Sequence, residues 1–230
     1  KKIPSLFARW FSAGQPRTTT SEVTPGCEWA MAGEGTPTVK LDGTAVLVRD
    51  GKRFARYDAK PGRTPPDGFE ACGSAPDPTT AHWPGWIPVG DAPEHRWHRE
   101  ASFEYGASTS ADGTYELIGP KVQNNPYGFR AHQLILHGNR QVNRLSSFDK
   151  VREYLRTKAV EGIVWHHPDG RMAKIKRADF GFPWPRVGQQ IPLERVANFV
   201  DEIVAIARHR STQPEPWFGR PYADDPGLER

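Results

Sequence analysis

Alternating apolar and polar residues in the middle of the chain predict short β-strands. The first two lie near 38–48 and 53–57, and Asp50-Gly51 between them is typical of a tight hairpin turn. A second pair of this kind, Asp112-Gly113, precedes the next alternating run. Further strands are expected at 114–118, 134–136, 161–167 and 171–177, the last two joined by a turn at Pro168-Asp169-Gly170.

Two helices are expected from other patterns. Ser147 is a typical N-cap residue, and the helix after it would run to about Lys158. In Leu193–His209 the apolar residues recur with the period of an amphipathic helix. Hairpins mixed with helices predict an α+β fold.

Proline and tryptophan mark the stretch 61–99, which we expect to be a long surface loop with aromatic anchors. The prolines in His82–Pro88 exclude a helix there. Trp83, Trp86 and Trp97 could stack on RNA bases, or they could pin the loop to the core.

The composition fits one lean domain over residues 1–230. Hydrophobic residues make up 37% of the chain, and the 22 glycines and 22 prolines predict long loops. Residues 1–35 are polar and turn-rich apart from short apolar clusters, and the tail from about 211 is expected to be loose. The net charge of +4 is compatible with a polyanionic partner but does not require one.

The same composition argues against several classes of protein. No apolar run approaches the ~18 residues that a membrane-spanning helix needs, and the start of the chain does not resemble a signal peptide. Cys27 and Cys72 are too few for a disulfide framework, so we expect a cytoplasmic protein. The eight histidines lack the spacing of a zinc site.

Lysines supply the first candidate chemistry. Lys40 stands at the end of a predicted strand and precedes Leu41-Asp42-Gly43, an arrangement that can present an amine to a phosphate. Lys174 and Lys176 project to one side of another predicted strand, because side chains alternate, and like charges there repel unless an anion lies between them. The other interpretations are a solvated hairpin lysine and an exposed edge strand protected by lysine.

Two glutamates are the second candidates. Glu116 lies inside an apolar strand and would need a partner if it were buried. Glu161 precedes a glycine and an apolar run, Gly162–Trp165. Both could also be ordinary glutamates that face solvent.

These four segments, in this order, resemble the covalent nucleotidyltransferase superfamily of ligases and capping enzymes, over about residues 34–177. Motif I is matched by Lys40–Gly43, motif III by Glu116–Gly119, motif IV by Glu161–Val164 and motif V by Lys174–Lys176. The run Glu116–Gln123, with Asn125–Gly128 and His137-Gly138 after it, is similar to a small family of ATP-dependent RNA ligases.

The resemblance implies a fold and a mechanism. The fold would be a nucleotidyltransferase (ATP-grasp-like) core of antiparallel sheets flanked by helices, with no C-terminal OB-fold domain. Lys40 would be the nucleophile that becomes linked to AMP, and Glu116 would hold the ribose. Glu161 would bind a divalent metal, and Lys174 and Lys176 would contact the phosphates.

The adenine contacts and motif Ia are also implied by the resemblance. Val164 would pack on one face of the adenine, and the backbone near Val39 would read its edge. The opposite face would fall to residues around Leu134–Leu136. Arg56 is the best match to the motif Ia arginine, with Arg53 and Lys60 as competitors.

The implied activity is ATP-dependent RNA ligation. The enzyme would join 5′-phosphate and 3′-hydroxyl ends of RNA, as a monomer, with ATP and Mg²⁺ or Mn²⁺ as cofactors. One alternative is an mRNA-capping-type guanylyltransferase, and another is a non-catalytic nucleic-acid-binding module on the same fold.

Overall fold

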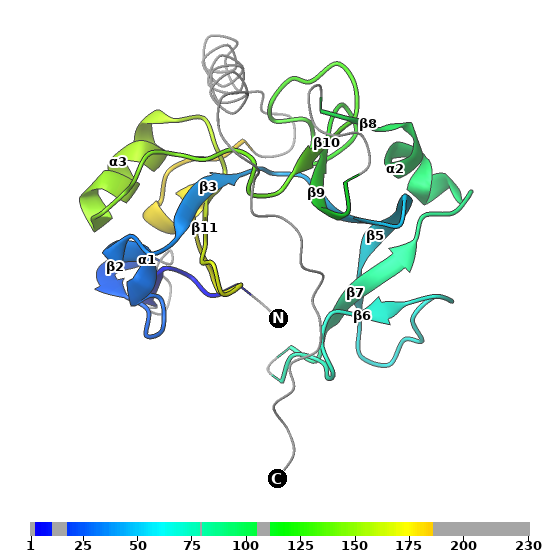
Figure 1. The fold of residues 1–230 in the computed structure, drawn as a ribbon, viewed down its shortest axis with the longest axis horizontal. Coiled ribbons are helices and arrows are strands. Elements are labelled where there is room, and N and C mark those ends of the chain that lie inside the picture. The colour runs from blue at the N-terminus through cyan, green and yellow to red at the C-terminus, as the bar shows by residue number, and fades with distance from the viewer. Residues whose placement is uncertain (1–2, 11–17, 79, 105–110, 186–230) are drawn as a thin grey trace.

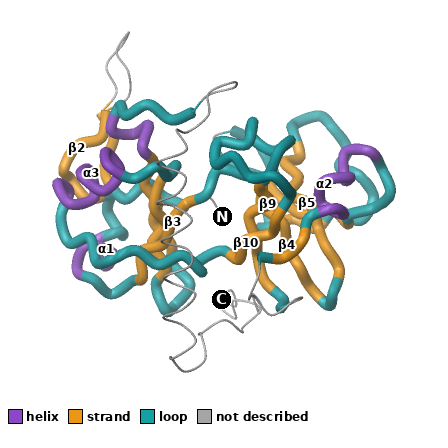
Figure 2. The backbone as a smooth tube through the Cα atoms, turned by 90° about the horizontal axis from the view of Figure 1, so that it is seen from above, coloured by secondary structure: helices purple, strands orange, loops and turns teal. Residues whose placement is uncertain are grey.

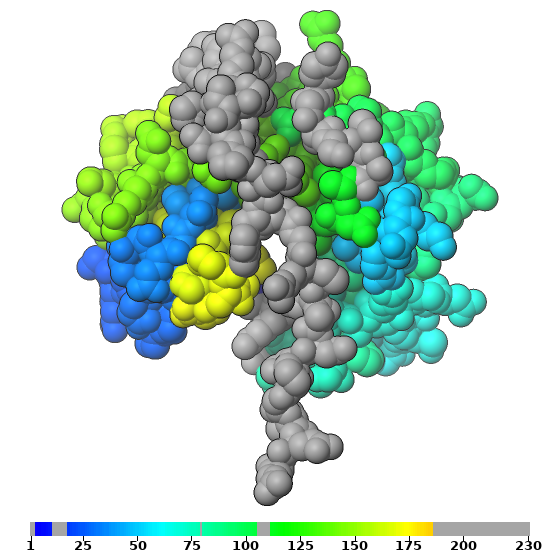
Figure 3. All heavy atoms as spheres, viewed as in Figure 1, coloured from blue at the N-terminus to red at the C-terminus, as the bar shows by residue number. Residues whose placement is uncertain are grey.

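A computed structural model describes residues 3–10, 18–78, 80–104 and 111–185 of the chain. These residues form two lobes, one built on a three-stranded sheet and the other on a seven-stranded sheet (Figure 1, Figure 2). In the space-filling view, blue and yellow atoms lie together in the first lobe, whereas cyan and green atoms make up the second (Figure 3). The first lobe therefore brings together segments that are far apart in the sequence.

The three-stranded sheet has β11 (Gly162–His166) in the middle, with β12 (Met172–Lys176) and β3 (Thr36–Lys40) on either side. Both pairings are antiparallel. Strands β11 and β12 fall within the predicted ranges and are joined at the predicted turn. The sheet therefore places the end of β3 next to two strands that lie more than a hundred residues later in the sequence.

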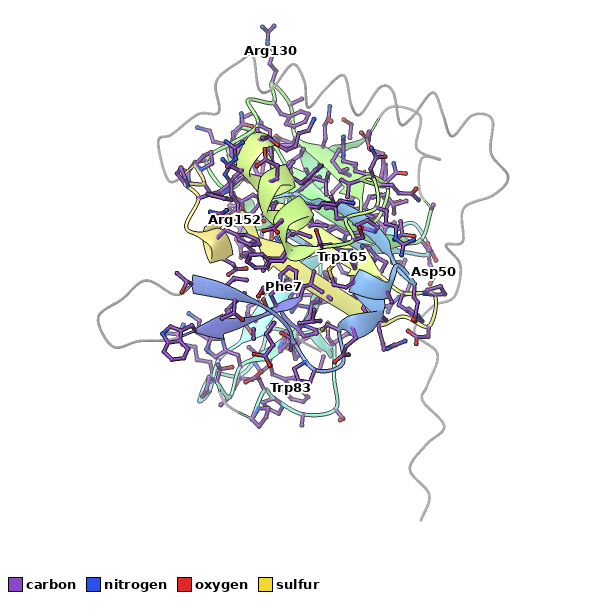
Figure 4. All side chains as sticks on the ribbon, turned by 90° about the vertical axis from the view of Figure 1, so that its left-hand side faces the viewer. Phe7, Asp50, Trp83, Arg130, Arg152 and Trp165 are labelled. Atoms are coloured by element: carbon purple, nitrogen blue, oxygen red, sulfur yellow. The ribbon has the colours of Figure 1, made fainter. Side chains whose placement is uncertain are left out.

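The core of the first lobe lies on one face of this sheet. Ile163, Trp165 and Ile175 are fully or almost fully buried and face α3 (Phe148–Thr157). Phe7 joins the same cluster, and Figure 4 labels it near Trp165, below the α3 ribbon. The opposite face of the sheet is left for polar side chains.

The N-terminal residues contribute more structure than the sequence predicted. Strands β1 (Phe7–Trp10) and β2 (Thr18–Val23) pair with each other, and α1 (Glu28–Ala32) follows them. The sequence predicted no strand or helix here, only a polar, turn-rich segment with short apolar clusters, and side chains of these clusters, such as Leu6, are completely buried in the core. Such short elements are stabilised by tertiary contacts rather than by a local pattern.

The seven-stranded sheet has the strand order β6-β7-β5-β4-β9-β10-β8. Its neighbouring strands are antiparallel, except for the parallel pair of β8 and β10. The predicted hairpin at Asp50-Gly51 and the predicted later strands are confirmed. The single strand expected near 38–48 was wrong in part, because the chain turns at Asp42-Gly43 and divides this run between β3 of the first sheet and the first strand of the hairpin in the second. The strands expected from the sequence are β4 (Thr44–Arg49), β5 (Lys52–Ala59), β9 (Gly113–Ile118) and β10 (Gln133–Leu136), and β8 (Ser102–Phe103) adds the far edge.

The stretch 61–99 is not simply a loop, so that prediction was wrong in part. It contains β7 (Trp83–Pro88), which pairs with β5, and the two-residue strand β6 (Glu70–Ala71). Pro84 accepts a hydrogen bond from the Cys72 N–H but has no N–H to return one, which ends the pairing with β6. After β7 come a 3₁₀ turn, η1 (Pro93–His95), and α2 (Arg96–Glu100).

The tryptophans of this stretch act as anchors. The Trp83 indole N–H donates to the Gly73 carbonyl at 2.8 Å, and its ring lies 6.0 Å from that of Phe69. Trp97 stacks on His132 at 4.7 Å and packs against the core of the second lobe. Of the two interpretations, these contacts favour the structural one.

The α+β class is confirmed, although helices are few in the described part of the chain. The assignment of the sheets to a nucleotidyltransferase core stays a prediction. The helix expected at Leu193–His209 and the tail from about 211 lie outside the described residues. Within the described ranges, no helix is long and apolar enough to cross a membrane.

Helix α3 is capped at both ends. The Ser147 hydroxyl accepts a hydrogen bond from the Lys150 N–H at 3.3 Å, which confirms the predicted N-cap. At the other end Arg177, only 6% exposed, donates to the carbonyls of Leu155 and Lys158. This guanidinium satisfies carbonyls that the last turn of a helix leaves without partners.

We expect Arg177→Ala to lower the free energy of unfolding by about 3 kcal/mol, because it leaves several buried carbonyls without donors. Urea unfolding followed by circular dichroism measures this change. Arg156→Ala is the control, since Arg156 lies on the exposed side of the same helix and its side chain pairs with Glu153. Equal small effects of the two substitutions would contradict the capping role of Arg177.

Candidate active site

The polar face of the three-stranded sheet carries the predicted lysines. In the strand register, Gly162 lies between Lys40 and Lys176. Two residues further along β11, Val164 lies between Thr38 and Lys174. Because alternate residues of a strand share a face, Lys40, Lys174 and Lys176 all belong to the face opposite the core.

Glu161 joins two of these lysines in one ion-pair cluster. Its Oε2 lies 2.5 Å from Lys40 Nζ, and its Oε1 lies 2.8 Å from Lys176 Nζ. The glutamate is 6% exposed, so the interpretation of Glu161 as a solvent-facing residue was wrong. An ionised carboxylate this deeply buried requires cations beside it, and here one lysine contacts each oxygen.

Two glycines permit the close approach of backbones at this site. A Cβ on Gly162 would lie 2.3 Å from the Ile175 carbonyl oxygen, so a side chain there would push β11 away from β12. A Cβ on Gly43 would lie 2.3 Å from the Leu117 carbonyl oxygen, where the chain crosses from β3 into the second lobe. The glycine in two of the quoted motifs therefore has a steric reason.

The electrostatics of the two later lysines differ. Burial, followed by the charges of Lys176 and Lys40, lowers the pKa of Lys174, which has no hydrogen bond or ion pair of its side chain within the described residues. Burial opposes the charged form of Lys176 too, but the hydrogen bond and charge of Glu161 outweigh it and raise the pKa of Lys176. Lys174 is thus a cation in need of an anion.

Strand β12 is the outer strand of its sheet, as the edge-strand interpretation of the lysines supposed. However, its edge is covered at Lys174, whose backbone N–H donates to Pro4 and whose carbonyl accepts from Leu6. The lysine side chains are therefore half-buried rather than exposed along a bare edge.

Asp42 is held from both sides where the two lobes join. Its backbone N–H donates to the Tyr127 hydroxyl at 2.7 Å, and its Oδ2 accepts from the Trp184 indole at 2.7 Å. Burial raises the pKa of Asp42, while the Trp184 hydrogen bond acts in the opposite direction. These contacts fix the turn that follows Lys40.

Glu116 finds the partner that a buried carboxylate needs. Its Oε2 lies 2.7 Å from His137 Nε2, and the glutamate side chain is 12% exposed. His137 Nδ1 lies 3.0 Å from the Thr114 hydroxyl. His137 had no predicted role, although its place after an apolar strand that could pair with the Glu116 strand was a usable signal.

His166 lies on the same face as the lysines and was also missed. Thr38 donates its hydroxyl hydrogen to the Val164 carbonyl at 3.2 Å, so the His166 Nε2, at 3.0 Å, has to be the donor to that hydroxyl. Burial and the nearby His137 lower the pKa of His166 to about 4. The neutral ring therefore forms part of the site floor at physiological pH.

Arg56 lies in the second lobe, away from the lysine cluster. Its guanidinium contacts Cys72 Sγ at 3.2 Å and lies over the Trp86 ring. Its competitor Arg53 donates to the carbonyls of His98 and Arg99. No contact within the described residues links either arginine to the cluster.

The predicted adenine contacts are only partly assembled. Val164 is half-buried on the lysine face, as predicted. The Val39 N–H donates to the Arg140 carbonyl at 2.8 Å. This hydrogen bond occupies the backbone donor of Val39, so that N–H is not available to an adenine. Of the predicted stretch Leu134–Leu136, Leu134 and Ile135 are buried in the two cores and do not present a surface to a base, whereas Leu136 is half-buried.

Comparison with known proteins adds an independent observation. The RNA ligase 1 family model matches residues 106–202. RNA ligase 1 of Rattus norvegicus is 32% identical over 141 residues, which is 45% of this chain and 42% of the relative. RNA ligase 1 of Danio rerio is 30% identical over 154 residues, 53% of this chain and 47% of the relative. The middle part of the chain is therefore similar to RNA ligase 1 proteins.

The chain spans less than half the length of these RNA ligase relatives. The family match includes the positions of Glu116, Glu161, Lys174 and Lys176 but begins after Lys40. The place of Lys40 in the site rests on the strand register and the contact with Glu161.

The buried histidines predict a loss of stability in acid. His98 and His166 have pKa values of about 4 in the folded chain, against an ordinary value of 6.5. Between these values the unfolded chain binds protons that the folded chain does not, so the free energy of unfolding falls as the pH drops from 6.5 toward 4. Urea titrations at several pH values measure the fall.

His166→Gln should make that fall smaller, because glutamine keeps a donor for Thr38 but does not titrate. An unchanged pH dependence in this variant would show that His166 is not held neutral by the fold.

Proposed function

We propose that this chain is an ATP-dependent RNA ligase that carries AMP covalently on Lys40. The observation that supports the proposal best is the cluster of Lys40, Glu161 and Lys176, with Lys174 beside it, on one face of a small sheet. Similarity to RNA ligase 1 proteins supports ligation, and the cluster supplies residues suited to nucleotidyl transfer.

The first step is the attack of Lys40 on the α-phosphorus of ATP. The amine must lose a proton before it attacks, and Glu161 Oε2, at 2.5 Å from Nζ, is placed to accept it. A nitrogen–phosphorus bond forms, the bond to the bridging oxygen breaks, and pyrophosphate leaves with the electron pair. Lys174 and Lys176 offset the negative charge that builds up on the phosphate.

Two further transfers complete the reaction. An oxygen of the RNA 5′-phosphate attacks the phosphorus of the bound AMP, and Lys40 leaves as the amine and regains a proton. A 3′-hydroxyl oxygen then attacks the RNA 5′-phosphorus, loses its proton and expels AMP. Each of the three steps exchanges one bond to phosphorus for another. The cations of the cluster can therefore offset the negative charge on the phosphate oxygens in all three steps.

The adenosine would lie over the Val164 side of the sheet. Glu116, oriented by His137, would accept hydrogen bonds from the ribose hydroxyls. Because the Val39 N–H is occupied by Arg140, an adenine edge at this position would be read through the Val39 carbonyl. Leu134 and Ile135 are too buried to cover the second face of the base.

A divalent metal fits the site in a limited way. Within the described residues no three acidic, histidine or cysteine side chains gather, so an all-protein metal site is absent there. Mg²⁺ commonly takes one or two carboxylates and fills its other positions with water and phosphate oxygens. Glu161 would be that carboxylate, and the ion would supply charge neutralisation at the phosphates.

The nucleophile is tested by labelling with ATP that is radioactive at the α-phosphate. We expect a label that is stable to alkali and lost in acid, as a phosphoamide is. Lys40→Ala and Lys40→Arg should reduce labelling to background, and Lys52→Ala, at an exposed lysine of the second lobe, should not. Labelling by GTP in place of ATP would favour the capping-type alternative, and a labelled Lys40→Ala would refute the assignment of the nucleophile.

Joining is tested separately, with nicked, hairpin and single-stranded RNA that carries a 5′-phosphate. At least one of these should be sealed with ATP, and removal of the 5′-phosphate should abolish sealing, because step two needs that group. Glu161→Gln should reduce sealing at least a hundred-fold, an order typical of a general base. Labelled protein that joins none of these RNAs would contradict ligation but not nucleotidyl transfer.

A further inference from the structure

A pocket of about 360 Å³ opens next to the lysine face, on the outer edge of β12. Lys174 and Lys176 line it from the strand, and Ser5 and Arg9 line it from the N-terminal segment. The two lysines therefore belong both to this pocket and to the face that carries Lys40.

The walls of the pocket are fixed by the backbone and by an ion pair. Leu6 N–H donates to the Lys174 carbonyl at 2.7 Å, and Lys174 N–H donates to the Pro4 carbonyl at 2.9 Å, so Ser5 is held beside the strand. Arg9 contacts Asp179 at 3.0 Å, and Asp179 in turn accepts from the Lys176 N–H at 2.8 Å. The pocket is thus built before any ligand arrives.

The pocket carries an excess of positive charge and several unused donors. Three cations, Arg9, Lys174 and Lys176, line it together with a single carboxylate, Asp179. Within the described residues, the buried Ser5 hydroxyl and Arg9 Nε have no hydrogen-bond partner. Buried donors without acceptors are rare in folded proteins and call for an explanation, and an anion would supply the acceptors.

We propose that this pocket binds the pyrophosphate portion of the nucleotide, with Arg9 as its principal ligand and Ser5 as a second donor. The inference rests on the proposed function. If Lys174 and Lys176 hold the α-phosphate near Lys40, the next phosphates of the chain extend toward the side of these lysines where Arg9 lies. A guanidinium can bind a phosphate through two parallel hydrogen bonds, which suits a leaving group that gains negative charge.

The other phosphate that could enter is the 5′-phosphate of RNA. Both candidates are phosphate groups and would bind the same donors, so they are distinguished by the reaction step in which the pocket acts. A pyrophosphate pocket acts in the formation of the lysyl-AMP bond and in its reversal by pyrophosphate. A 5′-phosphate pocket would act in the transfer of AMP from protein to RNA.

The test measures pyrophosphate binding to the full chain by calorimetry, in wild type, Arg9→Gln, Arg9→Lys and Ser5→Ala. We expect Arg9→Gln to weaken binding about tenfold or more, the lysine variant to retain part of it, and Ser5→Ala to weaken it less. Ser5→Ala removes a hydroxyl without a partner in the described chain, so it keeps the test valid if Arg9→Gln folds poorly. Arg49→Gln, at an exposed arginine paired with Glu70, is the matched control and should bind as wild type does.

The reaction steps give the second measurement. Arg9→Gln should slow labelling by ATP and its reversal by pyrophosphate, while transfer of AMP from labelled protein to RNA keeps its rate. Wild-type binding of pyrophosphate in both Arg9→Gln and Ser5→Ala overturns the proposal, and so does a defect confined to transfer to RNA. Arg9-dependent pyrophosphate binding in a protein that never becomes labelled would support the pocket and refute the proposed function.

Discussion

The burial of the Glu161 carboxylate between two lysines is the constraint around which this site is built. A carboxylate that is 6% exposed stays charged only if cations replace the water it has lost. Lys40 and Lys176 do so from opposite sides, at 2.5 and 2.8 Å. Because they come from β3 and β12, the cluster requires the middle strand β11 to bring the three segments into register, and it requires glycine at 162 to let the strands approach.

The rest of the first lobe holds β3, β11 and β12 in that register. The apolar face of the sheet packs on α3, whose last carbonyls are satisfied by Arg177, the residue directly after β12. The N-terminal segment covers the outer edge of β12 at Lys174. Through the turn anchored at Asp42, the same sheet is joined to the second lobe, where Glu116 and His137 form the neighbouring buried polar pair.

Most strands and α3 were predictable because their signals are local. The Asp50-Gly51 turn and the Ser147 cap act within a few residues. Alternation marks β9 and β12, and a short apolar run marks β11. Strand β7 was missed because its prolines argue against a strand, yet they lie where a missing N–H costs little. Strand β1 was missed because its stability comes from burial of Phe7 in a core formed by distant segments, and β2 was missed because it is held by its pairing with β1.

For the site, the candidate residues were found, but their partners were not. The contact between Arg9 and Asp179 joins residues 170 positions apart, and no pattern in the sequence points to it. The same holds for His137 beside Glu116 and for Trp184 beside Asp42. Spacing along a strand predicts which side chains share a face, whereas ion pairs across the fold depend on how the strands are assembled.

Peptide mapping by mass spectrometry, after reaction of the full chain with ATP, tests the central claim most directly. The account predicts a single AMP adduct on the peptide that contains Lys40. An adduct on the peptide containing Lys174 and Lys176, with Lys40 unmodified, would contradict it.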